Sequence, residues 1–285
     1  MALGAKRLVE KLFFLPQWKI GIAEGSLDGV VRDGKLPHLT WWAVDSCLDF
    51  QADPFFLGDD ILFERMNYWR GKGEIWIANA LGEHRDGFIR RPGHVSYPCV
   101  TKCNSRTFLL YESSTAGECR ILELMGSNWT EISYIDRPVV DGTLLYHGGR
   151  YWVFGTLPGE GVNRDLYLWW AESIEGPWHS HQANPVKQDV SSSRPAGGFF
   201  RSSMGLIRPT QDCATVYGGA IVFCRVQQLD EQRFEEISLL RLPAVEGFLG
   251  IHTINGNGHR IVIDVKQQVF HPLASLLKLR MALRR

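Results

Sequence analysis

A short cluster of polar, Pro, Gly and Thr residues recurs five times along the chain, followed each time by a tight polar turn and an apolar, aromatic run. The clusters are Ala52-Asp53-Pro54, Ser96-Tyr97-Pro98, Asp141-Gly142-Thr143, Arg194-Pro195-Ala196-Gly197 and Gly250-Ile251-His252-Thr253. The spacing is 44 residues from Asp53 to Tyr97, 44 from there to Asp141, 54 on to Pro195 and 57 on to His252. A period of roughly 40 to 50 residues with strand-like units is typical of propeller blades. Because equivalent positions of all blades converge on one axis, the repeat predicts that Asp53, Tyr97, Asp141, Arg194 and His252 lie together.

The repeat predicts an all-β fold, a five-bladed β-propeller over residues 38–268. Short strands with dense turns argue against an α/β fold, and the chain has no Pro-, Gly- or Ser-rich linker. An open ring would leave an unpaired edge. The isolated run Trp18–Ile22, within residues 1–37, is therefore expected to close the ring by joining the last blade.

The flanking segments carry weaker signals. A short helix is expected from Lys6 to Phe14, ended by Pro16, and residues 26–39 are expected to be loop. Trp41-Trp42-Ala43-Val44 is expected to lead into the first blade. The leucine-rich tail, residues 269–285, is consistent with two alternatives: a C-terminal helix or a tether to a further domain.

Composition limits the partners. The 285 residues include 31 basic and 31 acidic side chains, so no basic excess predicts nucleic acid or an anionic membrane as a partner. No run approaches the ~20 apolar residues that span a bilayer. The six cysteines lack paired metal-ligand spacing, and no secretory leader is apparent, so a cytoplasmic location with free thiols is expected. Aromatic residues are abundant; most suit a β core, and some could form platforms for sugar rings.

Three carboxylates are candidates for chemistry. Asp53 precedes Pro54, a residue confined to strand starts and edges, so its carboxylate is expected at the axis as a base, a nucleophile or only a turn cap. Glu64 and Glu112 each end a second strand after aromatic residues. Desolvation there would raise the carboxyl pKa, as a general acid needs; the alternative is a solvated strand end.

Basic residues are the second set of candidates. Arg194 and Arg208 could fork onto a carboxylate or phosphate of a ligand, or pair internally with Asp53, Asp141 or Asp212 as scaffolding. His94 and His252 open blades two and five, which favours a shared role, although a lone His is more often structural.

Glycosidic chemistry fits these residue types. It needs two carboxylates, about 5 to 5.5 Å apart for retention and about 6.5 to 9.5 Å apart for inversion. Asp53 and Glu112 could form such a pair across the axis. The sequence has no Ser nucleophile elbow, phosphate loop or dinucleotide fingerprint.

An ordered set of motifs resembles a known family. The set includes Ala52-Asp53-Pro54-Phe55, His94-Val95-Ser96-Tyr97-Pro98, Tyr111-Glu112-Ser113, Gly176-Pro177-Trp178, Asn184-Pro185-Val186, Arg194-Pro195-Ala196-Gly197, Gln211-Asp212-Cys213, Tyr217-Gly218 and Gly250-Ile251-His252-Thr253. Over about residues 38–265 it looks like the N-terminal propeller domain of plant glucosamine inositolphosphorylceramide transferases. Bacterial relatives of that domain stand alone or are fused to formyltransferase-like domains.

That domain is in turn similar to five-bladed glycoside hydrolases of families 32, 43 and 68. The resemblance implies Asp53 as base or nucleophile and Glu112 as acid. The Arg-Asp-Pro element that carries a further tuning Asp in those enzymes is replaced here by Ser96-Tyr97-Pro98. A last-blade His that helps hold a central cation would match His252, which implies an axial Ca²⁺ or Na⁺.

Three functions follow as alternatives. The first is a carbohydrate-active enzyme that acts on a glycan or glycolipid headgroup and requires no cofactor. Its expected catalytic residues are Asp53, Glu112 and Asp212. Its expected substrate-binding residues are His94, Tyr97, Asp141, Arg194, Arg208 and His252. The second is a non-catalytic glycan-binding module beside a glycosyltransferase or formyltransferase. The third is a scaffold whose axial groups satisfy one another. Unpaired carboxylates at the axis would favour a site, and closed Arg–carboxylate pairs would favour scaffolding.

Overall fold

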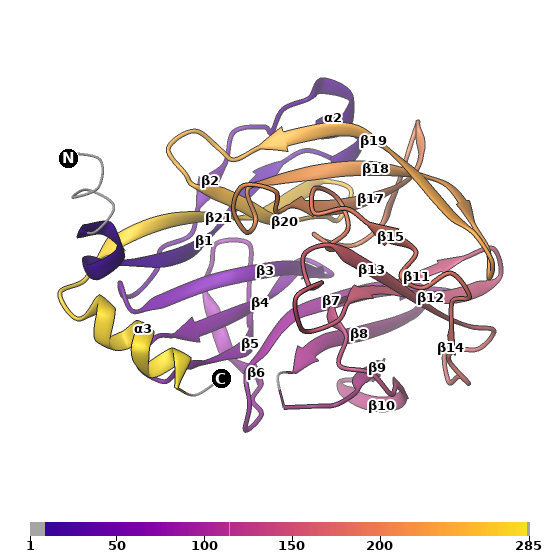
Figure 1. The fold of residues 1–285 in the computed structure, drawn as a ribbon, viewed down its shortest axis with the longest axis horizontal. Helices are drawn as coiled ribbons and strands as arrows, with labels where there is room; N and C mark the ends of the chain where they lie inside the picture. The colour runs from indigo at the N-terminus through magenta and orange to yellow at the C-terminus, as the bar shows by residue number, and fades with distance from the viewer. Residues whose placement is uncertain (1–8, 114, 284–285) are drawn as a thin grey trace.

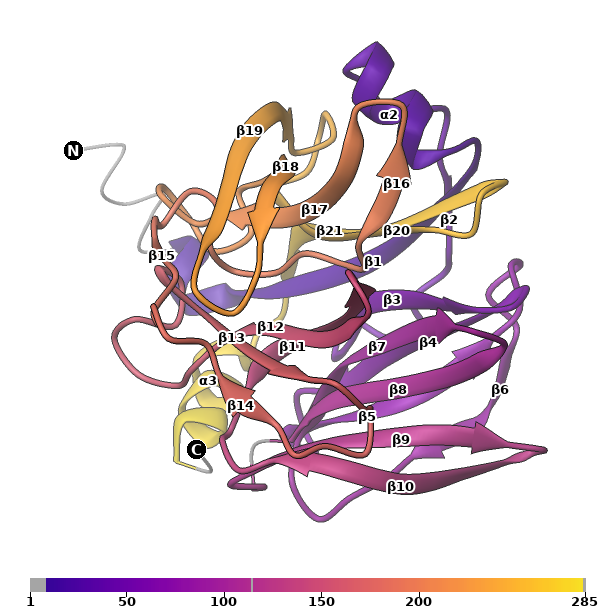
Figure 2. The ribbon, with the colours of Figure 1, turned by 90° about the vertical axis from the view of Figure 1, so that its right-hand side faces the viewer.

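The computed structural model describes residues 9–113 and 115–283. Five antiparallel sheets surround a common centre, as Figures 1 and 2 show from two sides. The inner strands of neighbouring sheets contact one another around this centre. The expected all-β, five-bladed propeller is therefore confirmed.

Blades one to three follow the sequence order. Blade one contains β3 (Asp49–Leu57), β4 (Asp60–Asn67), β5 (Lys72–Ala78) and β6 (His84–Ile89). Blade two contains β7 (Val95–Cys103), β8 (Arg106–Ser113), β9 (Cys119–Met125) and β10 (Asn128–Ile135). Blade three contains β11 (Val140–His147), β12 (Arg150–Thr156), β13 (Asp165–Ala171), β14 (His179–Ser180) and β15 (Lys187–Gln188).

Blade four differs at its inner edge, where Pro195 makes only an isolated bridge to Thr210. Its strands are β16 (Phe200–Ser202), β17 (Gly205–Asp212), β18 (Ala220–Leu229) and β19 (Phe234–Pro243). Blade five combines both ends of the chain: β20 (Gly250–Gly256), β21 (Arg260–Phe270), β1 (Phe14–Glu24) and β2 (Thr40–Trp41).

Ring closure comes from β1. This strand pairs with β21 over its whole length, from Phe14 opposite Phe270 to Glu24 opposite Arg260. The run Trp18–Ile22 therefore lies in the last blade, as a closing strand must. β2 then pairs with β1 in blade five, and the chain runs from Trp41-Trp42-Ala43-Val44 to β3 of blade one, with Trp41 itself in the last blade.

Short helices flank the ring. α2 (Leu27–Asp33) lies where the sequence indicated loop; Ser26 caps it, and three of its apolar residues are buried, which outweighs the Gly and Asp content. α3 (Ala274–Ala282) occupies the tail. The helix expected over 6–14 is present at residues 9–13, and its start lies outside the described residues. In the described part of the chain no helix is long and apolar enough to span a membrane.

The repeat has a local structural cause. The inner strands β3, β7, β11 and β20 each shift register at their cluster, which marks a bulge. In the first three, one residue takes a left-handed conformation: Asp53 at φ 52°, Tyr97 at φ 47° and Asp141 at φ 51°. Such backbone costs about 1 to 3 kcal/mol per non-glycine residue and concentrates at functional sites. The bulge re-aims one side chain per blade, which explains why these positions recur.

Candidate functional site

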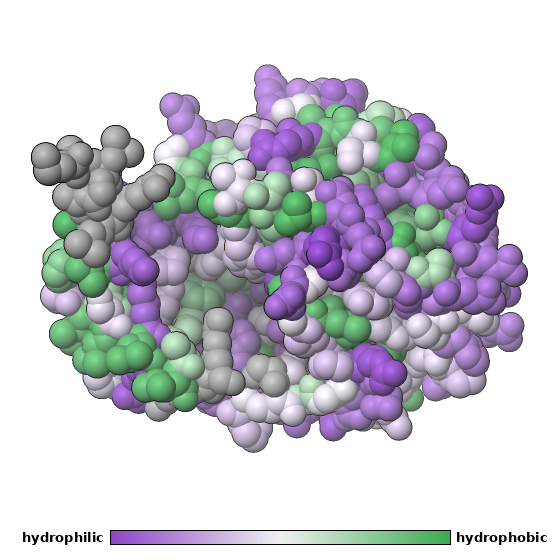
Figure 3. Space-filling model, viewed as in Figure 1, coloured by the Kyte–Doolittle hydropathy of each residue, from purple (hydrophilic) through white to green (hydrophobic). Residues whose placement is uncertain are grey.

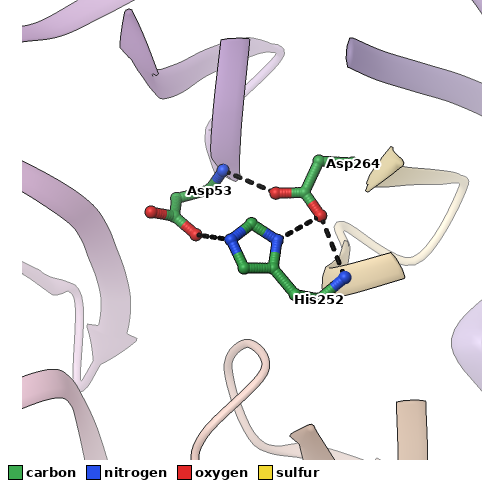
Figure 4. A group of neighbouring side chains, drawn as sticks. All are labelled: Asp53, His252 and Asp264. Atoms are coloured by element: carbon green, nitrogen blue, oxygen red, sulfur yellow. Dashed lines mark hydrogen bonds and ion pairs between the residues drawn. The ribbon is translucent and has the colours of Figure 1, made fainter. Parts of the chain in front are cut away.

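Two buried carboxylates and one imidazole form the centre of the site (Figure 4). His252 Nδ1 lies 2.7 Å from Asp264 Oδ1, and His252 Nε2 lies 3.4 Å from Asp53 Oδ1. Burial opposes a charge on the ring, but the negative charges of Asp264 and Asp53 outweigh it and raise the pKa of His252. The His252 ring therefore bridges blades one and five.

Backbone groups hold Asp264 in place. Its Oδ2 accepts the N–H of Asp53 at 2.8 Å. Its Oδ1 accepts the N–H groups of His252 at 3.2 Å and Thr253 at 2.9 Å. Asp264 is fully buried, so these donors replace water around its charge.

Asp53 is held by donors from two further blades. The Thr253 hydroxyl donates to Oδ1 at 2.9 Å, and the N–H of Tyr97 donates to Oδ2 at 3.3 Å. Burial raises the pKa of Asp53 to about 6, with the charge of His252 opposing the shift. Near neutral pH the carboxylate is largely ionised, with Oδ1 facing the imidazolium.

Aromatic rings pack against the imidazole of His252. Trp18 stacks on His252 with ring centroids 3.8 Å apart and planes at 17°, and Tyr217 meets it edge-on at 5.4 Å. The ring-closing strand therefore also supplies a wall of the site.

Tyr97 connects three blades from its position in blade two. Its hydroxyl lies 2.9 Å from Thr143 Oγ1 of blade three and accepts the N–H of Gly197 in blade four at 2.8 Å. Tyr97 is fully buried, so its phenol is a tie across the centre rather than a free contact for a substrate.

Asp141 and Arg194 form a closed pair. Arg194 Nε donates to Asp141 Oδ2 at 2.6 Å, and Gln211 Nε2 donates to the same oxygen at 3.1 Å. The guanidinium also bonds Asn163 Oδ1 and lies 4.8 Å above the Tyr217 ring. Arg194 is thus at the centre, as expected, but its charge is already matched.

Two glutamates, Glu64 and Glu112, also lie at the centre. Burial, then the charges of Asp141 and Asp53, raises the pKa of the partly buried Glu112 to about 8, while Arg194 opposes the shift. Burial, then Asp53 and Glu112, raises the pKa of Glu64 well above its usual value. His94 lies beside Glu64, with Nε2 3.3 Å from Oε1. The expected candidates Glu112 and His94 are therefore part of the same charged cluster.

Two of the expected site residues make their contacts elsewhere. Arg208 is 1% exposed, pairs with Glu236 and donates to the carbonyls of Ser192 and Ser193. Asp212 pairs with Arg241 at 2.7 Å. These contacts tie strands of blade four to each other and to its inner loop, and the expected roles of Arg208 in substrate binding and of Asp212 in catalysis stay predictions.

Sequence reasoning missed several members of the site. They are Trp18, Gln211, Tyr217, Thr253 and Asp264. Asp264 left a signal, because it interrupts the apolar run Ile261–Val265, and a carboxylate inside a buried strand needs partners. Trp18 left none, since its place depends on ring closure.

The same trio is the candidate cation site. One ligand atom from each of Asp53, His252 and Asp264 lies within 4.8 Å of the others. Ca²⁺ takes six to eight oxygen ligands, whereas this set offers one nitrogen and carboxylates already engaged by N–H and O–H donors. The residues fit an imidazolium better than Ca²⁺ or Na⁺, and no step below uses a metal.

Comparisons with known proteins agree with this fold. The family model described as glucosamine inositolphosphorylceramide transferase 1, N-terminal, matches residues 42–270. The transferase 1 of that name from Oryza sativa subsp. japonica is 29% identical over 225 residues, which are 73% of this chain and 30% of that protein. Its Arabidopsis thaliana counterpart is 27% identical over 208 residues, 67% of this chain and 27% of that protein. The chain therefore spans less than a third of the relatives' length.

Solved glycoside hydrolases share the architecture. A family 117 enzyme from Zobellia galactanivorans is 14% identical with a TM-score of 0.55, covering 90% of each chain. An exo-β-1,3-galactanase from Clostridium thermocellum is 8% identical with a TM-score of 0.53, covering 74% of this chain and 57% of its own. At such identities the likeness shows the fold alone. The family match decides the relationship: this chain belongs to the family of the N-terminal domain of glucosamine inositolphosphorylceramide transferase 1.

Proposed function

We propose that this carbohydrate-related propeller holds a glycan or glycolipid headgroup at its centre and cleaves or transfers a glycosidic bond. The observation that carries the proposal is the group of buried carboxyl groups at the centre, where Thr253 and Tyr97 hold Asp53 by hydrogen bonds, and where burial raises the pKa of Asp53 to about 6 and that of Glu112 to about 8. Pairs of titratable groups whose surroundings separate their pKa values mark an acid and a base.

The roles follow from these values. At neutral pH Glu112 keeps its proton and can donate it to the leaving oxygen of the glycosidic bond. Asp53 is ionised and either activates a water molecule or attacks the anomeric carbon. His252 and Asp264 fix the position of Asp53, and the imidazolium offsets its negative charge.

A second candidate is a glycan-binding module without chemistry. The closed Asp141–Arg194 pair favours it. So do the hydrogen bonds that Thr253 donates to Asp53 and Gln211 donates to Asp141, because such internal pairing is typical of scaffolding. The relatives' greater length leaves room for a separate transferase domain in those proteins. Glu64 and Glu112, which lie at the centre with raised pKa values, favour the catalytic candidate.

The deciding experiment is a reducing-sugar and mass-spectrometric assay over glycans and glycolipid headgroups. Wild type is compared with Asp53→Asn and Glu112→Gln, and with Glu246→Gln as an exposed control. Turnover lost in both site variants but kept in the control supports the enzyme. Binding without any turnover supports the module.

A further inference from the structure

An apolar surface lies at one edge of the ring. α3 buries Ala274 and Leu277 against Leu15 and Met66 but leaves its outer side apolar as well. We use the name leucine surface for a set of six side chains that are 39% to 79% exposed: Phe13, Trp69, Phe270, Leu276, Leu279 and Leu283. Large exposed apolar patches mark interaction sites.

The leucine surface is continuous. Trp69 lines one shallow depression together with Leu276, Leu279 and Leu283. The turn at residues 9–13 joins it, because Phe13 stacks on Phe270 at 6.3 Å and Ser275 donates to the Leu12 carbonyl. In Figure 3 it forms the green area at lower left, beside a hollow in the same face.

Cations outnumber acidic side chains in the segments that form this surface. Lys278 donates to the Lys11 carbonyl, and burial followed by the charge of Lys11 lowers the pKa of Lys278. Arg280 lies over the Trp69 ring at 5.0 Å, and its Nε has no hydrogen-bond partner among the described groups. Within residues 9–13 and 270–283, Glu10 supplies the sole acidic side chain. An anionic partner would relieve this repulsion.

Strand register places the leucine surface at the same end of the ring as the site. In blade one, α3 packs near the pair Asp49–Asn67, where β3 begins and β4 ends. In blade two the equivalent end is the pair Val95–Ser113, next to Ser96–Glu112. Glu112 therefore lies toward the end of the ring that carries α3, whereas the hairpin turn after Leu57 lies at the far end.

We propose that the leucine surface, with Lys11, Lys278 and Arg280 around it, docks the protein on an anionic lipid bilayer and so brings lipid headgroups to the rim of the site. Leucine and aromatic side chains insert at the acyl boundary while Lys and Arg meet the lipid phosphates. The net charge of the whole chain is zero and does not indicate this surface, because its positive charge is confined to the region around Lys11, Lys278 and Arg280. The glycolipid part of the inference rests on the proposed function; the docking itself does not.

The test uses vesicles that carry no glycan. The full chain is sedimented with phosphatidylcholine vesicles and with vesicles containing phosphatidylserine, at low and high salt. Wild type should bind the anionic vesicles about tenfold more tightly than the neutral ones, and salt should weaken binding. Leu276→Ser with Leu279→Ser, and separately Lys278→Gln with Arg280→Gln, should each reduce binding about tenfold.

The matched control is Leu81→Ser with Met125→Ser, two exposed apolar residues at the far end of blades one and two. It should bind as wild type does. Absence of binding by folded wild type, or equal binding by the surface variants, overturns the inference. So does a dimer in analytical ultracentrifugation that Leu276→Ser with Leu279→Ser dissolves, because the surface would then be a self-interface. Since these vesicles carry no sugar, a failure here leaves the glycosidic assay untouched.

Discussion

Arg194 Nε and Asp141 Oδ2 lie 2.6 Å apart, although the two residues are separated by 53 positions in the chain. The pair joins blades three and four, and Tyr217 covers the guanidinium. Arg194 was a candidate for binding an anionic group of the substrate, with internal pairing as the alternative. The structure has the second arrangement, so the charge of Arg194 is already matched within the protein.

Replacing Arg194 should change both the free energy of unfolding and the pKa of Glu112. Arg194→Met leaves the buried Asp141 with Gln211 alone, so we expect a loss of about 3 to 5 kcal/mol in the free energy of unfolding. It also removes the charge that opposes the high pKa of Glu112, so that pKa should rise further. Urea unfolding and the pH profile measure the two effects, with Arg194→Lys as the milder comparison. A variant as stable as wild type would contradict the closed pair.

The pH profile of any glycosidic activity should be bell-shaped. The rate should rise as Asp53 ionises near pH 6 and fall as Glu112 loses its proton near pH 8. Glu112→Gln should lower turnover by about 10² to 10⁴ and abolish the basic limb. Measurements of kcat/KM from pH 4 to 10 test this. A basic limb that persists in the variant would assign the acid to another group.

The repeat predicted much of this centre because bulges recur at a fixed spacing. Asp53, Tyr97 and Asp141 share a left-handed backbone and converge as the repeat required. The pairing of Arg208 was not predictable in this way. A sequence pattern places Arg208 on a strand, but it does not show that Glu236 lies beside it. The strand Trp18–Ile22 was expected to close the ring, but no local pattern gives its register against β21, which sets the positions of Trp18 and Asp264. α2 escaped notice because its seven residues carry Gly and Asp, and burial of Leu27, Val30 and Val31 decides its conformation.

Replacement of Glu112 should stabilise the fold at alkaline pH. Its pKa is raised from 4.5 to about 8 in the folded protein, so between these values the native state binds a proton that the unfolded chain has lost. Stability contributed by that proton is complete below about pH 4.5 and is lost as the pH rises through 8. Glu112→Gln removes this loss and should be more stable than wild type at pH 9 by about 1 to 3 kcal/mol. Thermal unfolding from pH 5 to 9 measures this difference in stability, with Glu246→Gln as the exposed control. If Glu112 stabilised the fold at pH 9, Glu112→Gln would be less stable than wild type there.

Arg208 should matter for folding and leave the site unaffected. Arg208→Met strands the buried Glu236 with Lys187 as its remaining cation, so we expect a loss of about 3 to 5 kcal/mol. The double variant Arg208→Met with Glu236→Leu should recover much of that loss, since it leaves neither charge of this pair buried. Any glycan bound by wild type should bind the folded variants equally. A selective loss of glycan affinity in the double variant would mean that Arg208 contributes to glycan binding.

Gly197 should resist substitution more than an ordinary turn glycine. Its φ is 140°, and a Cβ there would lie 2.1 Å from the Ile254 carbonyl oxygen, while its N–H bonds the Tyr97 hydroxyl. We expect Gly197→Ala to cost at least about 3 kcal/mol, because backbone strain adds to a clash with main-chain atoms. Gly148→Ala is the matched control, since that glycine has φ 62° and open space around it, and it should cost about 1 kcal/mol. Urea unfolding of both variants measures the difference; equal costs would mean that blade four can move away from blade five, and the tie through Tyr97 would then be weak.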